Sequence, residues 1–234
     1  VAKSDPNSLL IFSGGQTRLT VGPTSEALSY YYVANHNNLF NIKNNQQYNK
    51  ETMLSRVFLE EYARDSFENV LFSICRYYEI TKKYPSKITI IGFDFKKERF
   101  VKFHRYALKY PEPDFNYIGL NPNDLGKKTA NFDIMNSNSN SNSNTGYFNQ
   151  NKAMTGELEV LKMFANDLYG CGDGNPHSAL SSKRNLRNPF IRSIPYAISN
   201  PNIAPLLDYC YINDVITARG KHVFPDELPW EQME

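Results

Sequence analysis

Residues 9–27 read LLIFSGGQTRLTVGPTSEA and join a short apolar run to a glycine turn and a polar loop. The apolar run at 9–12 is typical of a strand buried on both faces of a parallel sheet. Gly14 and Gly15 follow, and residues without a Cβ allow a sharp turn and the close approach of a ligand. Open α/β sheets place ligands at the carboxyl ends of such strands. A tight turn without a ligand is the alternative interpretation.

A helix start completes this stretch. Ser25 offers a hydroxyl for an N-cap and Glu26 puts a carboxylate in the first turn, so the sequence predicts a helix over about 25–35. The polar loop before it carries Gln16 and Arg18, two further candidates for ligand contact.

Three more apolar runs, at 56–60, 88–93 and 115–119, are predicted to be strands. Between the first two, apolar residues recur at helical spacing behind Asp65, and Pro85 ends the pattern. Strands and helices that alternate along the chain favour a parallel sheet with helices on both faces. The predicted fold is therefore α/β, a Rossmann-like parallel sheet flanked by helices on both faces.

The strand-to-helix corner after residue 60 is rich in polar side chains. Asp65, followed three residues later by Glu68, is typical of a helix N-cap. A cap does not explain why Glu60, Ser66 and Asn69 crowd the same corner. Because the amino end of a helix favours anions, acidic groups there are either caps or partners for a ligand's donors. Both interpretations remain open at this stage.

A basic helix is predicted after the strand at 88–93. Lysines at this density usually form a solvated face. Lys96 and Arg99 differ because they fall in its first turn, nearest the strand ends.

The second half of the chain has a different texture. An alternating Asn/Ser tract at 136–144 is typical of a disordered linker, and 154–169 has helical spacing. Lys183, Arg184 and Arg187 then lie on a predicted loop between a glycine-rich segment and a proline. The chain is therefore predicted to have three parts: a Rossmann-like core at 1–130, a linker at 131–150, and an irregular, partly helical C-terminal extension at 151–234. The extension is expected to pack on the core, with Trp230 anchoring the end of the chain.

Composition excludes several classes of protein. The chain has 234 residues and a net charge of +2, so no nucleic-acid partner is indicated. No apolar run is long enough for a membrane span. The three cysteines are odd in number and widely spaced, which suits neither a disulfide framework nor a zinc site. They predict a reducing, intracellular and cytoplasmic location.

Taken together, the motifs resemble the SanA/YdcF-like family, known as domain of unknown function 218. The similarity covers about residues 9–120: SGG with a downstream SEA, then E-x5-S-x-E-N, then F-x3-R. The matching positions are Ser13, Gly14, Gly15, Glu26, Glu60, Ser66, Glu68, Asn69 and Arg99. Two positions depart from the family, with Ala63 in place of a common Ser and Lys96 in place of a His, so a mechanism that uses this His is not carried over.

The resemblance implies further features. Family members begin with an additional apolar strand upstream of the SGG strand, of which residues 1–8 show no trace. Bacterial relatives are thought to bind S-adenosylmethionine, which makes it one candidate ligand here. The later run YGCG…L-x-x-KR-x-x-RNP is similar to the tail of the eukaryotic, mainly fungal, branch.

These observations predict a domain that binds a polar, anionic small molecule, nucleotide-like or phosphorylated, at the strand ends. One alternative is a hydrolase or transferase with Glu26 or Glu60 as general base and an arginine that stabilises negative charge. Another is a scaffold without catalysis, and any protein partner is unknown. No metal site is indicated. The candidate ligand-binding residues are Ser13, Gly14, Gly15, Gln16, Arg18, Glu26, Glu60, Ser66, Glu68, Asn69, Lys96, Arg99, Lys183, Arg184 and Arg187.

Overall fold

The computed structural model describes residues 5–38, 53–121, 150–172, 179–212 and 221–232, together with residues 2, 215 and 216. The predicted linker at 131–150 lies outside these ranges except for residue 150, where a helix begins.

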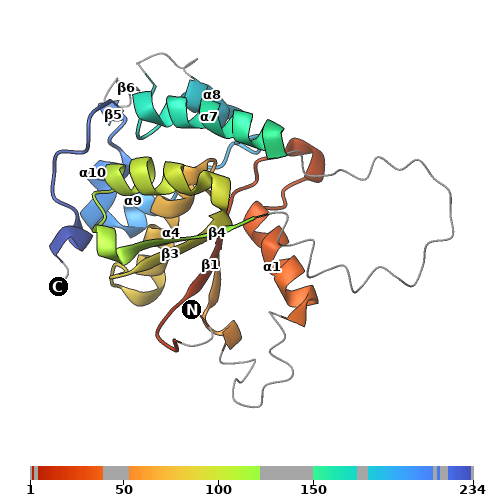
Figure 1. The fold of residues 1–234 in the computed structure, drawn as a ribbon. Coiled ribbons are helices and arrows are strands. Elements are labelled where there is room, and N and C mark those ends of the chain that lie inside the picture. The colour runs from red at the N-terminus through yellow and green to blue at the C-terminus, as the bar shows by residue number, and fades with distance from the viewer. Residues whose placement is uncertain are drawn as a thin grey trace, which may run out of the picture.

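Four strands form two parallel pairs (Figure 1). β1 (Leu10–Ser13) pairs with β2 (Val57–Glu60), and Ser13 lies opposite Glu60 at their carboxyl ends. β3 (Ile88–Phe93) pairs with β4 (Phe115–Leu120). The α/β class is therefore confirmed, as are all four predicted strands and the parallel direction within each pair. A further short pair, β5 (Tyr211–Ile212) and β6 (Val215–Ile216), is antiparallel.

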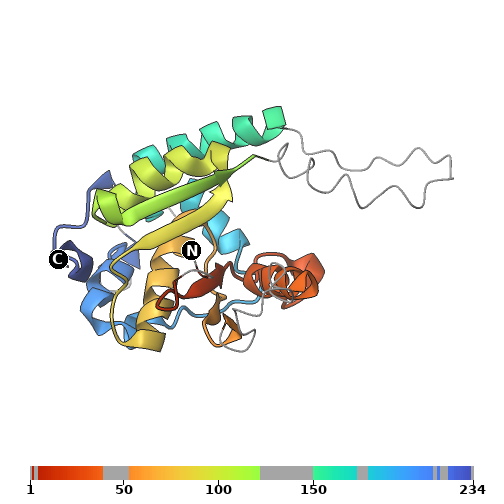
Figure 2. The ribbon, with the colours of Figure 1, turned by 60° about the horizontal axis from the view of Figure 1, so that its bottom comes forward.

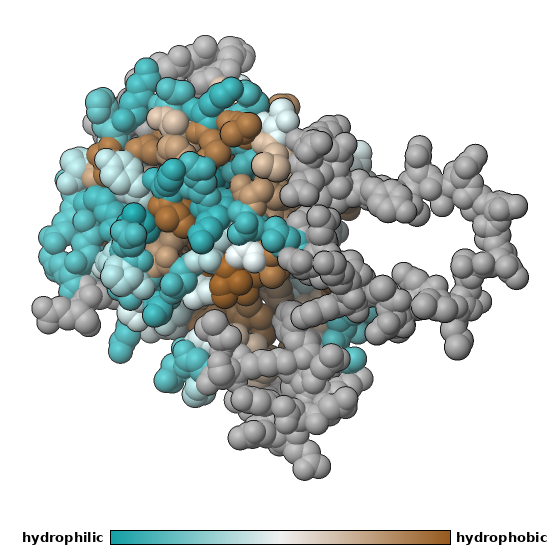
Figure 3. Space-filling model, viewed as in Figure 1, coloured by the Kyte–Doolittle hydropathy of each residue, from teal (hydrophilic) through white to brown (hydrophobic). Residues whose placement is uncertain are grey.

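The described strands do not form the one flanked sheet that was predicted. The two parallel pairs are separate sheets, and Figure 2 shows the gold and green β3–β4 pair apart from the red β1. One face of β3–β4 is also open: Ile91 and its neighbour in register, Ile118, are 61% and 43% exposed. Parallel strands are normally covered on both faces. Figure 3 shows apolar surface in the region where Figure 1 draws β3, β4 and β1.

Two helices begin at the predicted caps. α1 (Glu26–His36) has Ser25 as its N-cap, which accepts a hydrogen bond from Leu28 N. α4 (Ser66–Thr81) has Asp65 as its N-cap, which accepts from Glu68 N. It ends at Lys82, whose left-handed backbone (φ 59°) closes the helix shortly before Pro85.

The predicted basic helix after β3 is wound irregularly. It begins as a 3₁₀ turn, η3 (Asp94–Lys96), continues as a π-helix, η4 (Arg99–His104), and ends in one short α-helical turn, α5 (Arg105–Ala107). π-helical segments are rare and frequently occur at functional sites.

The remaining elements are mostly short. The long helix of the second half covers α7 (Gln150–Asn166), against 154–169 from the sequence. The segment with the three basic residues is helical at α8 (Ala179–Leu186), where a loop was predicted. The others are η1 (Leu19–Val21), η5 (Glu112–Asp114), α9 (Tyr196–Ser199), η6 (Pro201–Ile203), α10 (Ala204–Leu207) and η8 (Pro229–Gln232).

The main core joins the C-terminal segments to α4. Most of its buried side chains come from α4, η4 and α5, from α7 and α8, and from the segment between α9 and Trp230. Trp230 is 1% exposed, and its indole N–H donates to the carbonyl of Leu108 over 2.6 Å. The prediction that Trp230 anchors the end of the chain is confirmed.

The cysteine prediction was wrong. Cys171 and Cys210, 39 residues apart, form a disulfide, and Cys75 is a buried free thiol. An odd count does not prevent one pair from meeting, because proximity is set by the fold. The pairing removes the argument for a reducing location, since disulfides persist in oxidising compartments. Within the described ranges, no helix combines the length and apolar content needed to cross a bilayer.

Candidate functional site

The carboxyl ends of β1 and β2 meet in a partly buried polar cluster. The hydroxyl of Ser13 donates to Glu60 over 2.6 Å and lies 3.0 Å from the side-chain oxygen of Asn69. Parallel pairing brings the first two together, and the first turn of α4 brings Asn69 to the same point. Three of the predicted site residues therefore share one cluster.

Glu60 is closed off from solvent. Its side chain is fully buried and accepts from Ser13, from the backbone N–H groups of Tyr62 and Ala63, and from the hydroxyl of Tyr196. Burial raises the pKa of the Glu60 carboxyl, although these hydrogen bonds act in the opposite direction. Because both oxygens already have donors, Glu60 of β2 is placed to hold β1, the corner before α4 and α9 together.

Gly14 lets α1 approach the end of β1. Its φ is 147°, and a Cβ built there would lie 2.6 Å from the Cβ of Glu26. The backbone N–H of Glu26 donates to Gly15 O, and the N–H of Gly15 donates to Ala63 O. The two glycines thus join β1 to α1 and to the corner before α4, and Glu26 is left exposed beside them. Gln16 and Arg18 lie on the loop that follows, Gln16 partly buried and Arg18 exposed.

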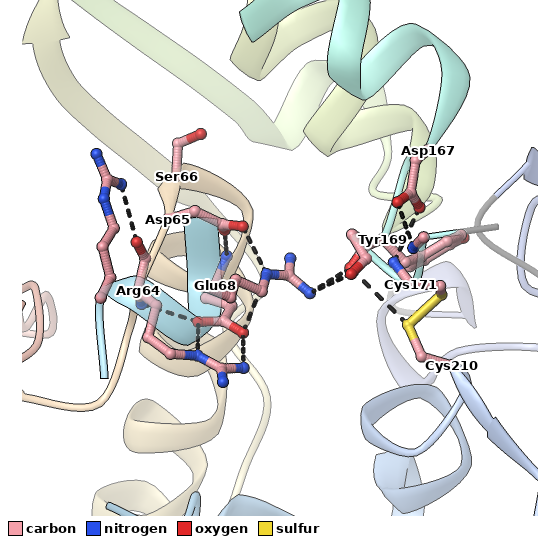
Figure 4. A network of polar contacts seen from close by, with 12 residues as sticks. Arg64, Asp65, Ser66, Glu68, Asp167, Tyr169, Cys171 and Cys210 are labelled. Atoms are coloured by element: carbon pink, nitrogen blue, oxygen red, sulfur yellow. Dashed lines mark hydrogen bonds and ion pairs between the residues drawn. A yellow bond between two sulfur atoms is a disulfide. The ribbon is translucent and has the colours of Figure 1, made fainter. Parts of the chain in front are cut away.

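An ion network covers the amino end of α4 (Figure 4). The guanidinium of Arg184 in α8 lies 2.6 Å from Asp65 and 3.3 Å from Glu68, and it donates to Tyr169 O. Arg64 binds both oxygens of the Glu68 carboxylate, at 2.5 Å from Oε1, which Arg184 also approaches, and at 3.0 Å from Oε2. Burial alone would raise the pKa of Asp65, but the charge and hydrogen bond of Arg184 more than offset this and hold it below its ordinary value.

The three basic residues predicted to bind a ligand, Lys183, Arg184 and Arg187, lie in different surroundings. Arg184 reaches back to the start of α4, but it is buried and neutralised there by carboxylates. The exposed Arg187 donates to the carbonyl of Arg64, and the ammonium of Lys183 lies 3.2 Å from the sulfur of Met163. Of the three, Arg187 is exposed and Lys183 is partly exposed, whereas Arg184 is buried and paired with carboxylates.

A second group of charges lies where β3 runs into η4. Arg99 is 8% exposed and pairs with Glu157 of α7 at 3.1 Å. Lys96 is half-buried, with its ammonium 5.4 Å from the ring centre of Phe93, and it forms no ion pair with any residue that the structure describes. Burial lowers the pKa of both cations, and Arg99 lowers that of Lys96 further.

This group connects with other predicted residues through longer-range electrostatics. Glu26 and Arg187 both act on Lys96, and Arg187 also acts on Arg99. Residues from α1, η3, η4 and α7, and the residue that follows α8, therefore contribute to one electrostatic environment. We call Lys96, Arg99 and Glu157 the cation cluster.

Sequence reasoning missed three residues beside these groups. Tyr196 donates to Glu60, Glu157 pairs with Arg99, and His104 lies 2.8 Å from the hydroxyl of Ser66. His104 was not among the predicted site residues. The sequence signal was the histidine's place on the apolar face of a helix that also carries Arg99.

Other features of the surface lie away from this chemistry. A pocket of about 450 Å³ between α1, β2 and α4 contains none of the predicted site residues, and is lined by Leu28, Tyr31, Leu54, Val57, Phe58, Leu59, Glu61 and Arg76. The described residues also include no group of three or more His, Cys, Asp or Glu side chains that could hold a metal ion.

Fold and site together define an α/β protein with buried charges gathered beyond the carboxyl ends of two parallel strand pairs. Among curated proteins, the chain is similar to uncharacterised protein YOR238W of Saccharomyces cerevisiae, with 34% identity over 214 residues. The match covers 80% of this chain and 65% of the yeast protein, so the chain spans less than two thirds of its relative. No family model and no solved structure matches. The comparison supports a fungal relationship, while the SanA/YdcF-like resemblance is not shown.

Proposed function

We propose that this protein binds a phosphorylated or nucleotide-like small molecule through an anionic group held at the cation cluster. One observation carries the proposal. Arg99 pairs with the carboxylate of Glu157, Lys96 forms no ion pair among the described residues, and the buried Nε of Arg99 has no hydrogen-bond partner there. A buried donor without an acceptor is costly, by about 1–3 kcal/mol. An anion would supply the missing acceptor.

The charge balance supports the same conclusion. Burial disfavours the charged form of Lys96, and the neighbouring Arg99 adds repulsion. A phosphate group beside them would offset both effects, since an opposite charge within about 4–6 Å favours the charged form. The exposed Arg187 is close enough to affect both cations and adds a third positive charge.

The chemistry of the cluster also separates candidate ligands. S-adenosylmethionine carries a sulfonium, and a cation placed beside Lys96 and Arg99 would be repelled. The described residues therefore suit a phosphate-bearing ligand better than S-adenosylmethionine. The enzymatic alternative has less support at Glu60, because its oxygens already accept four hydrogen bonds and no solvent reaches them. Glu26 is exposed and stays available as a general base.

We also propose that the protein has a Rossmann-like fold and is related to the SanA/YdcF-like family. A further parallel strand, hydrogen-bonded to β1 on one side and β3 on the other, would join the two pairs into one sheet. The pairing supports it, because among the described strands β1 pairs with β2 alone and β3 with β4 alone, which leaves one edge of each for a further strand.

We expect the Lys96→Met variant to bind inorganic phosphate or adenosine 5′-monophosphate at least ten-fold more weakly than the wild type. A charge-assisted hydrogen bond in a partly desolvated site contributes about 1.5–3 kcal/mol, and 1.4 kcal/mol corresponds to a factor of ten. Isothermal titration calorimetry at low ionic strength measures the affinity, and urea unfolding checks that the variant is folded.

The matched control is Lys97→Met, which removes the same charge from the next, exposed position. It should reduce affinity only slightly, because exposed charges are screened by solvent. Equal losses in the two variants would mean that the net charge of the protein, and not the cation cluster, attracts the anion. Failure of the wild type to bind any of the phosphate compounds would overturn the proposed function.

A further inference from the structure

The Ser66–His104 pair joins the start of α4 to the end of η4. The hydroxyl oxygen of Ser66 lies 2.8 Å from Nε2 of His104. The imidazole is completely buried, and its ring makes edge contacts with the rings of Phe67, Phe100 and Phe164. Three aromatic rings therefore fix the histidine's orientation, and Ser66 contacts the Nε2 atom.

The other ring nitrogen shows where the proton resides. Nδ1 of His104 is buried without a hydrogen-bond partner among the described residues. A neutral imidazole has one N–H and one bare nitrogen. An orphaned buried N–H is rarer in proteins than an orphaned acceptor. The favoured tautomer therefore carries its proton on Nε2, which donates to Ser66.

The surroundings of His104 keep the imidazole neutral. Burial and the charge of Arg99 lower the pKa of His104 to about 3, against a smaller opposite effect of Asp65. Arg184 also disfavours the imidazolium. Near neutral pH the imidazole therefore stays uncharged, with a single N–H, which this tautomer places on Nε2 as a donor.

The direction of this hydrogen bond decides whether the hydroxyl proton of Ser66 is available to a ligand. If His104 donates, the hydroxyl oxygen of Ser66 is the acceptor and its own proton is free to bond elsewhere. Ser66 is partly exposed, and it is the first residue of α4, where backbone N–H groups also lack helical partners. Arg99 and His104 lie at the two ends of the same π-helical segment, so the Ser66 contact and the orphaned Nε of Arg99 are held by one element.

We propose that His104 is a positioning residue that holds the Ser66 hydroxyl as an outward-facing hydrogen-bond donor to the anionic group of the ligand. The inference rests on the proposed function for the existence of that ligand. It goes beyond that function in two ways. It says that the bound group accepts a hydrogen bond from Ser66, and that His104 holds Ser66 in position to donate it.

A nucleophilic role for Ser66 is the competing interpretation, and the geometry opposes it. A histidine that accepts a serine proton becomes an imidazolium, which catalytic triads stabilise with a carboxylate at Nδ1. Nδ1 of His104 faces no such carboxylate in the part of the chain that the structure describes. Its aromatic enclosure would leave the new charge unsolvated.

The tautomer can be tested without any ligand. Nitrogen-15 correlation spectra of the histidine side chains at pH 7 should show His104 as the Nε2–H tautomer. Observation of the Nδ1–H tautomer, or of an imidazolium, would overturn the inference and leave the proposed anion binding standing.

The role of Ser66 is tested with two probe anions, inorganic phosphate and sulfate, titrated at pH 7.5 and followed by amide shifts in α4. Sulfate only accepts hydrogen bonds, whereas hydrogen phosphate both donates and accepts. If Ser66 is a donor, Ser66→Ala should weaken both anions about ten-fold. Loss of phosphate binding alone would show that Ser66 is an acceptor and would overturn the inference.

Two variants at His104 separate positioning from packing. His104→Gln can place an amide N–H near Nε2 and should retain most of the sulfate affinity. His104→Phe keeps an aromatic ring among its neighbours but removes the donor, and should weaken sulfate about as much as Ser66→Ala. Equal binding by the two variants would contradict the positioning role. If the folded wild type binds neither anion, the proposed function fails, and the assignment of Ser66 to a ligand fails with it.

Discussion

Acidification from pH 7 to pH 4 is expected to cost the wild-type protein about 3 kcal/mol of unfolding free energy through His104 alone. The pKa of His104 is about 3 in the folded protein and about 6.5 in an unfolded chain. As the pH falls below 6.5, the unfolded state binds the proton first. The stability is therefore fully present above pH 6.5 and is lost progressively toward pH 3.

Urea unfolding at several pH values, compared between the wild type and His104→Gln, measures this contribution. The difference isolates His104 from other groups: Asp65, with a lowered pKa, also loses stability as the pH falls, whereas Glu60, with a raised pKa, gains it. The charged groups that act on His104 are Arg99, Asp65 and Arg184, and they are unchanged in the variant. His222→Gln, at an exposed position, is the matched control. A wild-type-to-variant difference that stays constant from pH 7 to pH 4 would contradict the assignment.

Replacement of Arg184 by Gln is expected to destabilise the protein by about 3–5 kcal/mol, because it leaves the buried Asp65 without its compensating charge. Glu68 would keep Arg64, but Asp65 has no other cation at ion-pair distance among the described residues. The sequence had placed Arg184 on a loop, among the candidate ligand-binding residues. The structure revises this because Arg184 is only 9% exposed and is enclosed by α4 and Tyr169.

Arg187→Gln is the control for this experiment. Arg187 is exposed and makes one hydrogen bond to a backbone carbonyl, so its loss should change the unfolding free energy by no more than about 0.5 kcal/mol. Chemical denaturation at neutral pH compares the two variants. A stable Arg184→Gln protein would show that solvent reaches Asp65 and that the network is less buried than described.

The sequence predicted features whose causes are local. Asp65 and Ser25 were identified as helix caps because a cap needs only a side chain and an N–H three residues later. The strand at Ile88–Phe93 was predicted from its mainly apolar residues. Each of these signals lies within a few residues of the structure it specifies.

The site depends on contacts that have no local signal. Arg184 meets Asp65 across 119 residues of chain, and His104 meets Ser66 across 38. The spacing of Lys96 and Arg99 suggested a regular helix, but the π-helical winding of η4 decides which side chains face α4 and α7. The separation of the strands into two pairs was likewise not predicted, since an apolar run does not specify which edge of a strand finds a partner.

The Cys171–Cys210 disulfide has a consequence for how the molecule opens. The chain between the two sulfurs carries Arg184, which holds Asp65, and Tyr196, which holds Glu60. Both acidic groups at the strand ends therefore depend on one covalently closed segment. A cross-link limits the conformations that such a segment gains when it detaches, so its opening is suppressed as a unit. Under reducing conditions, amide hydrogen exchange should rise together across α8, α9 and α10, and the buried carboxylates would be the first groups in the core to meet water.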